Sequence, residues 1–385
     1  MRILLATKTM DMGGIERSVV AIARELRKRR HSVWVVSSGG YLVRELERDE
    51  TPHIFAPLEI TSPFGIARSA QTIRRLVHNC HVDLVHSFSA TASMAINLAL
   101  RASSTNGAVR ARLVSSPMGL QNSPRELPVT TWLRNWVLKL GAERIIVISP
   151  EIRRHLKQVG ARDECLVDFS FVGLDVDRLA GSTDNRASVC REFGFDEDVR
   201  IVSTIGALHP RKSHELFVDA AALVAKKAPH ARFLIVGDGE LRRELEQRAR
   251  ARGLGGHLVF TGVRDDVARL LSATDVYVKP GIVEGYIGVT VLEALAMRKP
   301  VVAFDTQDVK LALTNGVTGV VVPNADTAAL AEKILHLLDN PDEGVRLGEA
   351  GRKLVEERFH TGLLAQQLEQ FYQRVLNPSA PSVAR

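Results

Sequence analysis

The feature that most constrains this sequence is the alternation of short apolar runs with amphipathic segments of helical periodicity. The first apolar run, residues 2–6, reads RILLA, and such an uninterrupted run is typical of a strand that is buried on both faces. It is followed by a segment over 15–29 in which Val19, Ile22 and Leu26 recur at helical spacing. Strands that alternate with helices in this way favour parallel sheets with helices on both faces, so we predict an α/β fold.

The same alternation occurs twice along the chain. In the first part, further strands are predicted at 33–37, 83–86, 112–115 and 144–148. After the polar stretch 181–188, strands are predicted at 200–205, 232–236, 257–261, 275–279 and 300–304, and helices at 213–227, 239–252, 264–272 and 289–298. Residues 341–376 are predicted to be mostly helical and the tail 377–385 to be disordered. A chain of 385 residues is long enough for two domains, so we expect two doubly wound lobes, over 1–170 and 171–356.

The cysteine content and the lack of a long apolar segment limit the cellular setting. Cys80, Cys165 and Cys190 are widely spaced and form neither a disulfide framework nor a zinc-binding pattern, which fits a reduced cytoplasm. No run of about 18 apolar residues suggests a membrane-spanning helix. The N-terminus lacks the pattern of a secretory signal. We therefore expect a cytoplasmic protein.

The positive charge is concentrated in the first part of the chain. Residues 1–165 contain 24 Lys and Arg against 14 Asp and Glu, whereas the remainder contains 27 against 30. This imbalance suggests an anionic partner for the first lobe, such as lipid phosphates, a phosphorylated acceptor or nucleic acid. The simpler interpretation is a well-solvated basic surface. Nucleic acid is the weakest of these partners, because the basic part has no motif in which aromatic and basic residues interleave, and we predict no nucleic-acid binding.

The loops that follow strands are where an α/β protein of this type binds ligands. Gly13 and Gly14 end the first such loop at the start of a helix, where free N–H groups favour a phosphate; the alternative is a plain tight turn. The loop does not have the GxGxxG spacing and lacks the acid of a nicotinamide site. In the loop 206–215, Arg211 and Lys212 provide cations that can clamp a diphosphate, although a solvated basic helix start would look the same.

Two acids lie close together in the segment 281–295, which reads GIVEGYIGVTVLEAL. Glu284 follows a predicted strand on a glycine-rich loop, and Glu293 lies among apolar residues in the helix that comes next. A carboxylate accepts hydrogen bonds from paired hydroxyls such as those of a sugar or a ribose. Gly285 and Gly288 allow backbone amides to approach a ligand closely.

Three features together resemble the retaining glycosyltransferases of family four. They are the first-loop order Gly13-Gly14-x-Glu16, Lys212 after the second lobe's first strand, and the run EGYIGVTVLEALAMRKPVVAFD over 284–305. The segments 172–175 and 260–280 also resemble this family. The resemblance implies a GT-B fold, in which two Rossmann-like lobes hold a nucleotide sugar and their parallel sheets face across a cleft. It also implies that a terminal helix over 357–376 crosses back to the first lobe.

The resemblance also implies roles for individual residues. Lys212, Glu284 and His86 would be catalytic: Lys212 would neutralise the diphosphate, Glu284 would bind hydroxyls of the transferred sugar, and His86 matches the first position of a His-x-His segment. Donor-binding residues would be Gly14 and Arg211 at the phosphates, Val263 and Arg264 near the base, Gly285, Tyr286, Ile287 and Gly288 around the sugar, and Glu293 at the ribose.

The sequence departs from the family pattern at three places. Glu284 and Glu293 are nine positions apart, whereas the family usually has eight. The usual Gly-Arg-Leu segment has Ala207 at its centre, so Arg211 becomes the candidate for the missing phosphate arginine. The second histidine of His-x-His is Phe88, and a buried, satisfied histidine is an alternative role for His86.

These patterns lead to a functional prediction with open alternatives. We predict a retaining hexosyltransferase that uses a UDP- or GDP-linked sugar without a cofactor or metal, since no Asp-x-Asp motif lies in a suitable loop. The acceptor would be a lipid-linked or cell-envelope glycan. The segment 124–143 is basic and amphipathic, which suggests peripheral attachment to the inner face of an anionic membrane, although an ordinary lobe helix is the alternative. A nucleotide-sugar epimerase and a non-catalytic pseudo-glycosyltransferase that acts as a sugar-nucleotide-binding scaffold remain as rival functions.

Overall fold

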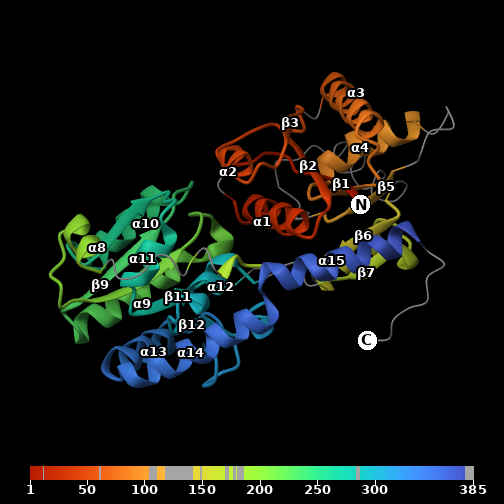
Figure 1. Cartoon of the computed structure of the whole chain (residues 1–385). Coiled ribbons are helices and arrows are strands. Elements are labelled where there is room, and N and C mark those ends of the chain that lie inside the picture. Colours follow the sequence, from red (N-terminus) through yellow and green to blue (C-terminus); the bar gives the residue numbers. More distant parts are fainter. Residues whose placement is uncertain are drawn as a thin grey trace. The chain divides into compact units, whose positions relative to one another are not determined.

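The structure is a computed structural model, and it describes residues 1–11, 13–59, 62–103, 111–117, 142–147, 150–169, 173–176, 179, 186–282 and 287–377. The chain forms two compact units (Figure 1). The first consists of Met1–Gly173 together with Thr361–Arg385, and the second of Leu174–His360. The first unit is therefore built from both ends of the sequence.

The first unit contains a seven-stranded parallel sheet with the order β3-β2-β1-β4-β5-β6-β7. Its strands are β1 (Arg2–Ala6), β2 (Ser32–Ser37), β3 (His53–Phe55), β4 (Leu84–Ser87), β5 (Arg112–Ser115), β6 (Arg144–Val147) and β7 (Leu166–Asp168). The described helices are α1 (Gly14–Lys28), α2 (Val43–Arg48), α3 (Pro63–Asn79), α4 (Ala90–Ser103), α6 (Pro150–Gln158), the 3-10 turn η2 (Asp163–Cys165) and α15 (Thr361–Leu376).

Strand β1 shows why an uninterrupted apolar run suits this position. Ile3 and Leu5 point into the core on the face covered by α1 and α15, whereas Leu4 and Ala6 point into the core on the face covered by α3 and α4. Successive side chains of a strand alternate between faces, so a strand with helices on both sides requires apolar residues at every position.

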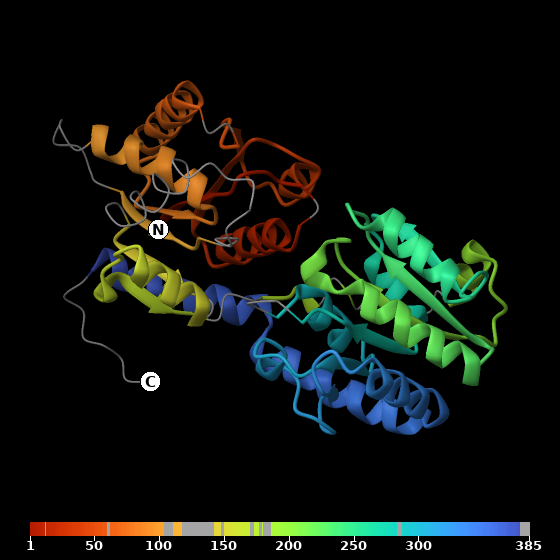
Figure 2. The same ribbon diagram turned by 180° about the vertical axis from the view of Figure 1, so that it is seen from behind.

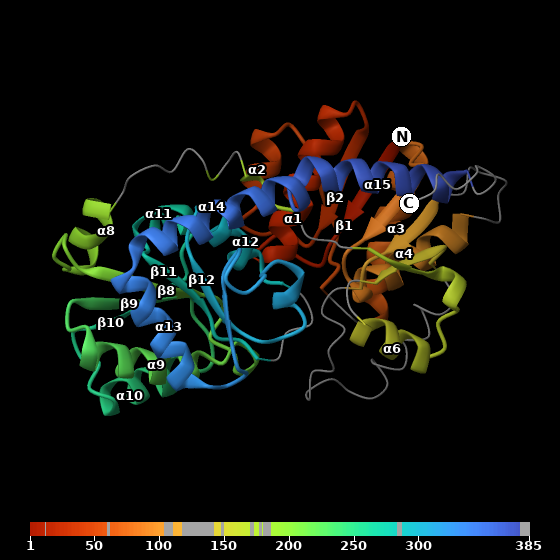
Figure 3. The same ribbon diagram turned by 90° about the horizontal axis from the view of Figure 1, so that it is seen from below.

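The C-terminal helix α15 is part of the first unit's core. Its apolar face contributes six buried residues to the same cluster as β1 and α1: Leu364, Ala365, Leu368, Phe371, Tyr372 and Val375. Figures 1 and 3 show α15 running beside α1. The last part of the chain therefore completes the hydrophobic core begun by the first strand.

The second unit contains a six-stranded parallel sheet with the order β10-β9-β8-β11-β12-β13. Its strands are β8 (Arg200–Ile205), β9 (Ala231–Val236), β10 (Leu258–Gly262), β11 (Val276–Lys279), β12 (Val301–Phe304) and β13 (Val320–Val322). The described helices are α8 (Arg186–Phe193), η3 (Pro210–Lys212), α9 (His214–Lys227), α10 (Arg242–Ala251), α11 (Val267–Ala273), α12 (Val289–Ala296), η4 (Val309–Leu311), α13 (Thr327–Asp339) and α14 (Pro341–Arg358). Figure 2 shows helices on both faces of this sheet.

The predicted α/β class and all ten predicted strands are confirmed, each within one or two residues of its bounds. The sequence prediction missed β3, β7 and β13, which are strands of three residues. It also missed α13 and began α10 and α11 three residues early, because non-helical residues precede both helices. The tail predicted to be disordered lies outside the described residues from 378 onward.

Candidate functional site

In a doubly wound sheet, ligands bind at the carboxyl ends of the two strands between which the strand order reverses. In the second unit these are β8 and β11, because β9 and β10 lie on one side of them and β12 and β13 on the other. The loop after β8 carries Lys212, and the loop after β11 leads through Gly288 into α12. The topology thus brings two of the segments predicted to bind the donor to one sheet edge.

The loop after β8 is held in a compact shape. The Lys212 amide donates to the His209 carbonyl over 2.9 Å, and Ser213 adopts a left-handed conformation as α9 begins. A side chain at Gly237, which has a φ of +139°, would place its Cβ 2.1 Å from the Gly206 carbonyl oxygen. Glycine is therefore required at Gly237 for the loop after β9 to pack against this one.

A small cavity of about 20 Å³ joins the two loops. The residues that line it include Lys212, His214, Lys279, Gly281, Gly288 and Thr290. The Tyr277 hydroxyl donates to Oγ1 of Thr290 over 2.9 Å, and Thr290 in turn donates to the Ile205 carbonyl over 3.3 Å. These bonds fix the start of α12 to β8 and β11, so Lys212 and the α12 N-terminus lie against the same space.

Helix α12 carries an acid into an apolar environment. Gly288 precedes the helix, and both Ile287 and Gly288 are buried. Glu293 is only 7% exposed, one turn further along α12. Three other predicted donor residues, Glu284, Gly285 and Tyr286, lie outside the described residues.

His214 directly follows Lys212 and Ser213 and was not singled out from the sequence. It is almost completely buried and lines the cavity. Burial lowers the pKa of His214 to about 4; the carbonyl of Ala207 opposes this shift and the positive charge of Lys212 adds to it. The imidazole is therefore neutral at pH 7, and Lys212 is the positive charge that this loop brings to the cavity.

The other predicted donor residues of the second unit lie outside the lining of this cavity. Val263, after β10, is 66% exposed. The Arg264 guanidinium donates to Asp266 over 2.8 Å and to Glu192 over 2.6 Å, and these carboxylates raise its pKa. Arg211 is half-buried on η3 beside Lys212.

In the first unit, Gly14 is exposed and is the first residue of α1. The carboxylate of Glu16 folds back over Gly13, the residue before Gly14, because a Cβ added at Gly13 would lie 2.0 Å from Oε2 of Glu16. Burial raises the pKa of Glu16, and the nearby charge of Asp11 acts in the same direction. An acid therefore already lies at the helix N-terminus where the sequence predicts a phosphate contact, so a phosphate there would have to displace it.

His86 lies in the core of the first unit and is completely buried. Its Nδ1 is 2.6 Å from the hydroxyl of Tyr372 on α15, and its Nε2 is 2.7 Å from Oγ of Ser116. Its ring stacks on Phe88 at a centroid distance of 4.2 Å. Burial lowers the pKa of His86 to about 3, so it is neutral at physiological pH. This geometry matches the satisfied core histidine that the sequence left as an alternative to a catalytic one.

Comparison with known families agrees with this architecture. The first unit matches the family model described as Glycosyltransferase Family 4 over residues 12–167, and the second matches the model described as Glycosyl transferases group 1 over residues 199–340. Together the two matches cover more than half of the chain. This protein belongs to glycosyltransferase family four.

Curated relatives agree with this assignment, and a solved structure shows the same fold. The chain is 26% identical over 385 residues to a phosphatidyl-myo-inositol mannosyltransferase of Mycobacterium tuberculosis, covering 96% of this chain and 95% of that protein. It is 27% identical to the alpha-D-kanosaminyltransferase of Streptomyces kanamyceticus, but this match spans only 64% of either chain. The crystal structure of Anabaena HepE with UDP and glucose superimposes with a TM-score of 0.80 at 21% identity, covering 97% of this chain and 99% of that one. The GT-B fold is thereby confirmed.

One expected feature of this family-four protein falls largely outside the structure. Residues 118–141, which contain most of the predicted membrane-facing segment 124–143, are not among the described residues. Within the described ranges, no helix combines the length and apolar character needed to cross a bilayer.

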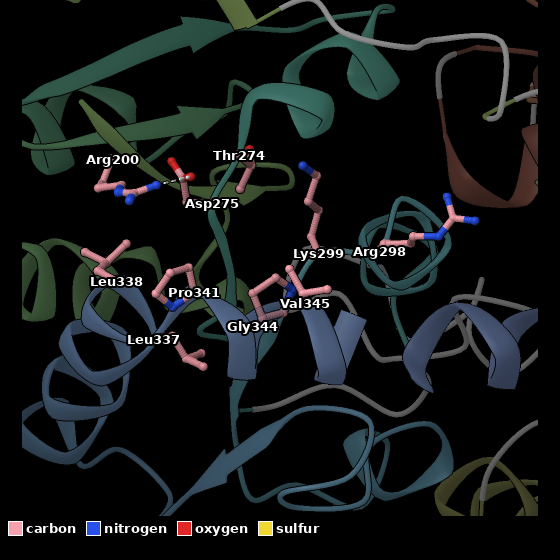
Figure 4. Close-up of a pocket in the computed structure, with 11 residues that line it drawn as sticks. Arg200, Thr274, Asp275, Arg298, Lys299, Leu337, Leu338, Pro341, Gly344 and Val345 are labelled. Carbon is pink, nitrogen blue, oxygen red and sulfur yellow. Dashed lines mark hydrogen bonds and ion pairs between the residues drawn. The ribbon is translucent and has the colours of Figure 1, made fainter. Parts of the chain in front are cut away.

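A second cavity, of about 170 Å³, lies at the opposite edge of the second sheet (Figure 4). It is lined by residues at the amino ends of strands, where Arg200 pairs with Asp275 at 3.4 Å. Nζ of Lys299 donates to the Ser272 carbonyl over 2.8 Å. These charged groups are satisfied within the protein, so the cavity between β8 and β11 is the better candidate for the donor site.

Proposed function

We propose that this protein transfers a hexosyl group from a UDP- or GDP-linked sugar, with retention of anomeric configuration and without a metal ion, to a lipid-linked or cell-envelope glycan. The observation that carries this proposal is the cavity at the carboxyl ends of β8 and β11. It places Lys212 beside the start of α12, the helix that holds the buried Glu293. A cation and a helix N-terminus favour a diphosphate, and a buried carboxylate can accept hydrogen bonds from the hydroxyls of a ribose.

The barrier to such a transfer is dominated by the charge that develops on the departing diphosphate. Fixed positive groups aimed at that charge are the largest single source of rate enhancement in many enzymes. In the proposed mechanism Lys212 and the first amides of α12 stabilise the diphosphate, with Arg211 as a further donor. Glu293 accepts from the ribose hydroxyls, and Glu284 accepts from hydroxyls of the transferred sugar.

The names of relatives support the donor and acceptor classes. HepE was solved with UDP and glucose, and the mycobacterial relative is named for transfer of mannose to a phosphatidylinositol. The excess of basic residues in 1–165 fits an acceptor that carries phosphate. On this basis we place the acceptor on the first unit and expect peripheral attachment at an anionic membrane.

One observation favours a second candidate, a protein that binds a nucleotide sugar without transferring it. Phe88, which replaces the second histidine of His-x-His, is buried against His86 and offers no polar group. Ala207 likewise has no side chain that could reach a phosphate. Such a protein would bind the donor through Lys212 and produce no glycosylated product.

Thermal unfolding with a panel of UDP- and GDP-linked sugars distinguishes these possibilities. A donor present at 100 times its Kd stabilises the fold by about 2.7 kcal/mol. We expect one nucleotide class to raise the Tm of the wild type, Lys212→Ala to abolish that rise, and Lys227→Ala, at the exposed end of α9, to leave it intact. Product formation with a retained anomeric configuration, unaffected by EDTA, would establish transfer. Binding without any product would favour the second candidate, and no binding at all would contradict both.

A further inference from the structure

A buried ion pair lies beside the candidate donor site and has no role in the mechanism above. Lys279 is the last residue of β11, and its Nζ lies 3.0 Å from Oδ2 of Asp308, the residue before η4. The two side chains are 6% and 1% exposed. Because β11 and β12 are adjacent parallel strands, with Lys279 opposite Ala303, the pair joins the loops that leave both strands at the same sheet edge.

Stability alone does not account for this pair. Removing two charges from water costs several kcal/mol per ion, and well-packed apolar residues often replace such pairs without loss of stability. Oδ1 of Asp308 makes no hydrogen bond within the described part of the chain, so even the aspartate is incompletely compensated. Because burying this ion pair costs free energy, we look for its role in holding the main chain at a defined position.

The lysine fixes the main chain where the donor loop begins. Its Nζ also donates to the Gly281 carbonyl over 3.0 Å. Both Lys279 and Gly281 line the cavity that contains Lys212 and Gly288. One ammonium group thus connects the loop after β12, through Asp308, to the first turn of the loop after β11.

We infer that Lys279 and Asp308 are positioning residues for sugar transfer. They hold the main chain at Gly281, so that the end of β11 keeps its position relative to Lys212 across the cavity. The inference rests on the function proposed above, and it assigns neither residue a contact with the reacting atoms. Alignment of this kind matters because a displacement of about 1 Å in an active site can cost about 10²-fold in rate.

The test compares single and double replacements in the full-length protein. Lys279→Met and Asp308→Asn each leave one buried partner uncompensated, whereas the double variant Lys279→Met/Asp308→Leu removes both charges. We expect the single variants to lower the Tm and the double variant to recover most of it. In all three, amide hydrogen exchange of the peptide spanning 280–289 should accelerate, and kcat should fall by about 10²-fold.

Two controls separate positioning from general stability. Lys279→Arg keeps the charge and should restore part of kcat and of the exchange protection. Arg248→Met breaks an ion pair with Asp219, at 2.6 Å, between α10 and α9, and should lower the Tm without changing exchange over 280–289.

Two results would overturn the inference. One is unchanged exchange over 280–289 in both single variants, and the other is a double variant that regains kcat and exchange protection together with its Tm. The exchange measurement needs no substrate, so it decides this inference even if the wild type transfers no sugar and the proposed function fails.

Discussion

The bond between His86 and Tyr372 joins the C-terminal helix to the first unit's sheet, and breaking it should weaken that unit without stopping catalysis. Tyr372→Phe removes one oxygen atom and leaves Nδ1 of His86 without its 2.6 Å partner in a fully buried position. A buried polar group that loses its hydrogen bond costs about 1–3 kcal/mol. We therefore expect the free energy of unfolding of the first unit to fall by about 2 kcal/mol.

Urea unfolding followed by tryptophan fluorescence measures this change in the first unit alone. All three tryptophans, Trp34, Trp132 and Trp136, belong to Met1–Gly173. With a urea slope of about 2 kcal/mol per molar, a loss of about 2 kcal/mol moves the midpoint down by about 1 M. Tyr41→Phe alters a tyrosine that is 47% exposed and should leave the midpoint unchanged.

The same variant distinguishes a core role of His86 from a catalytic one. If His86 is a core residue, Tyr372→Phe retains its kcat/KM at temperatures where the protein is folded. An unchanged urea midpoint combined with a large loss of kcat/KM would refute this reasoning and return His86 to the catalytic group.

Three further predictions concern pH, packing and donor affinity. Because the pKa of His86 is about 3 in the folded protein against 6.5 ordinarily, the unfolded chain binds an extra proton below pH 6.5. The contribution of His86 to the stability of the first unit should therefore be complete above pH 6.5 and fall by about 1.4 kcal/mol per pH unit below it. Urea titrations at several pH values should show that His86→Gln removes this contribution and that His78→Gln, on the exposed face of α3, does not. Gly348→Ala would place a Cβ 2.1 Å from a backbone carbonyl oxygen and should destabilise the second unit by about 1–3 kcal/mol in thermal melts, whereas Gly255→Ala, with open space around it, should not. Glu293→Gln should raise the Kd of the nucleotide sugar about 10-fold or more in calorimetry, as expected when a charged hydrogen bond of about 1.5–3 kcal/mol is lost, and an unchanged Kd would remove Glu293 from the donor site.

The strands of the fold were predictable because the pattern that identifies each of them lies within a few consecutive residues. Residues 3–6 are apolar at every position, and this pattern identifies a strand with helices on both sides without reference to any other segment. Strand β13 has three residues, too few to show a period, and its role as an edge strand depends on pairing with β12. Short edge strands are therefore the elements that pattern analysis misses.

The candidate site was predictable in its parts but not in its contacts. Lys212 and Gly288 were identified as loop residues after strands, but their meeting depends on the order in which β8 and β11 lie in the sheet. The partner of His86 lies 286 residues away on α15, which no local pattern indicates. The pairing of Lys279 with Asp308 also requires the sheet register, because each residue alone is an ordinary charged residue near a loop.

The most direct test of the central claim is amide hydrogen exchange of the full chain with and without a saturating nucleotide sugar. If the donor binds at the carboxyl ends of β8 and β11, protection should appear in peptides covering 206–215 and 287–293. Peptides covering 298–300 and 341–345, beside the cavity at the opposite edge of the sheet, should exchange as before. Protection at that opposite edge, with none around Lys212, would contradict the account.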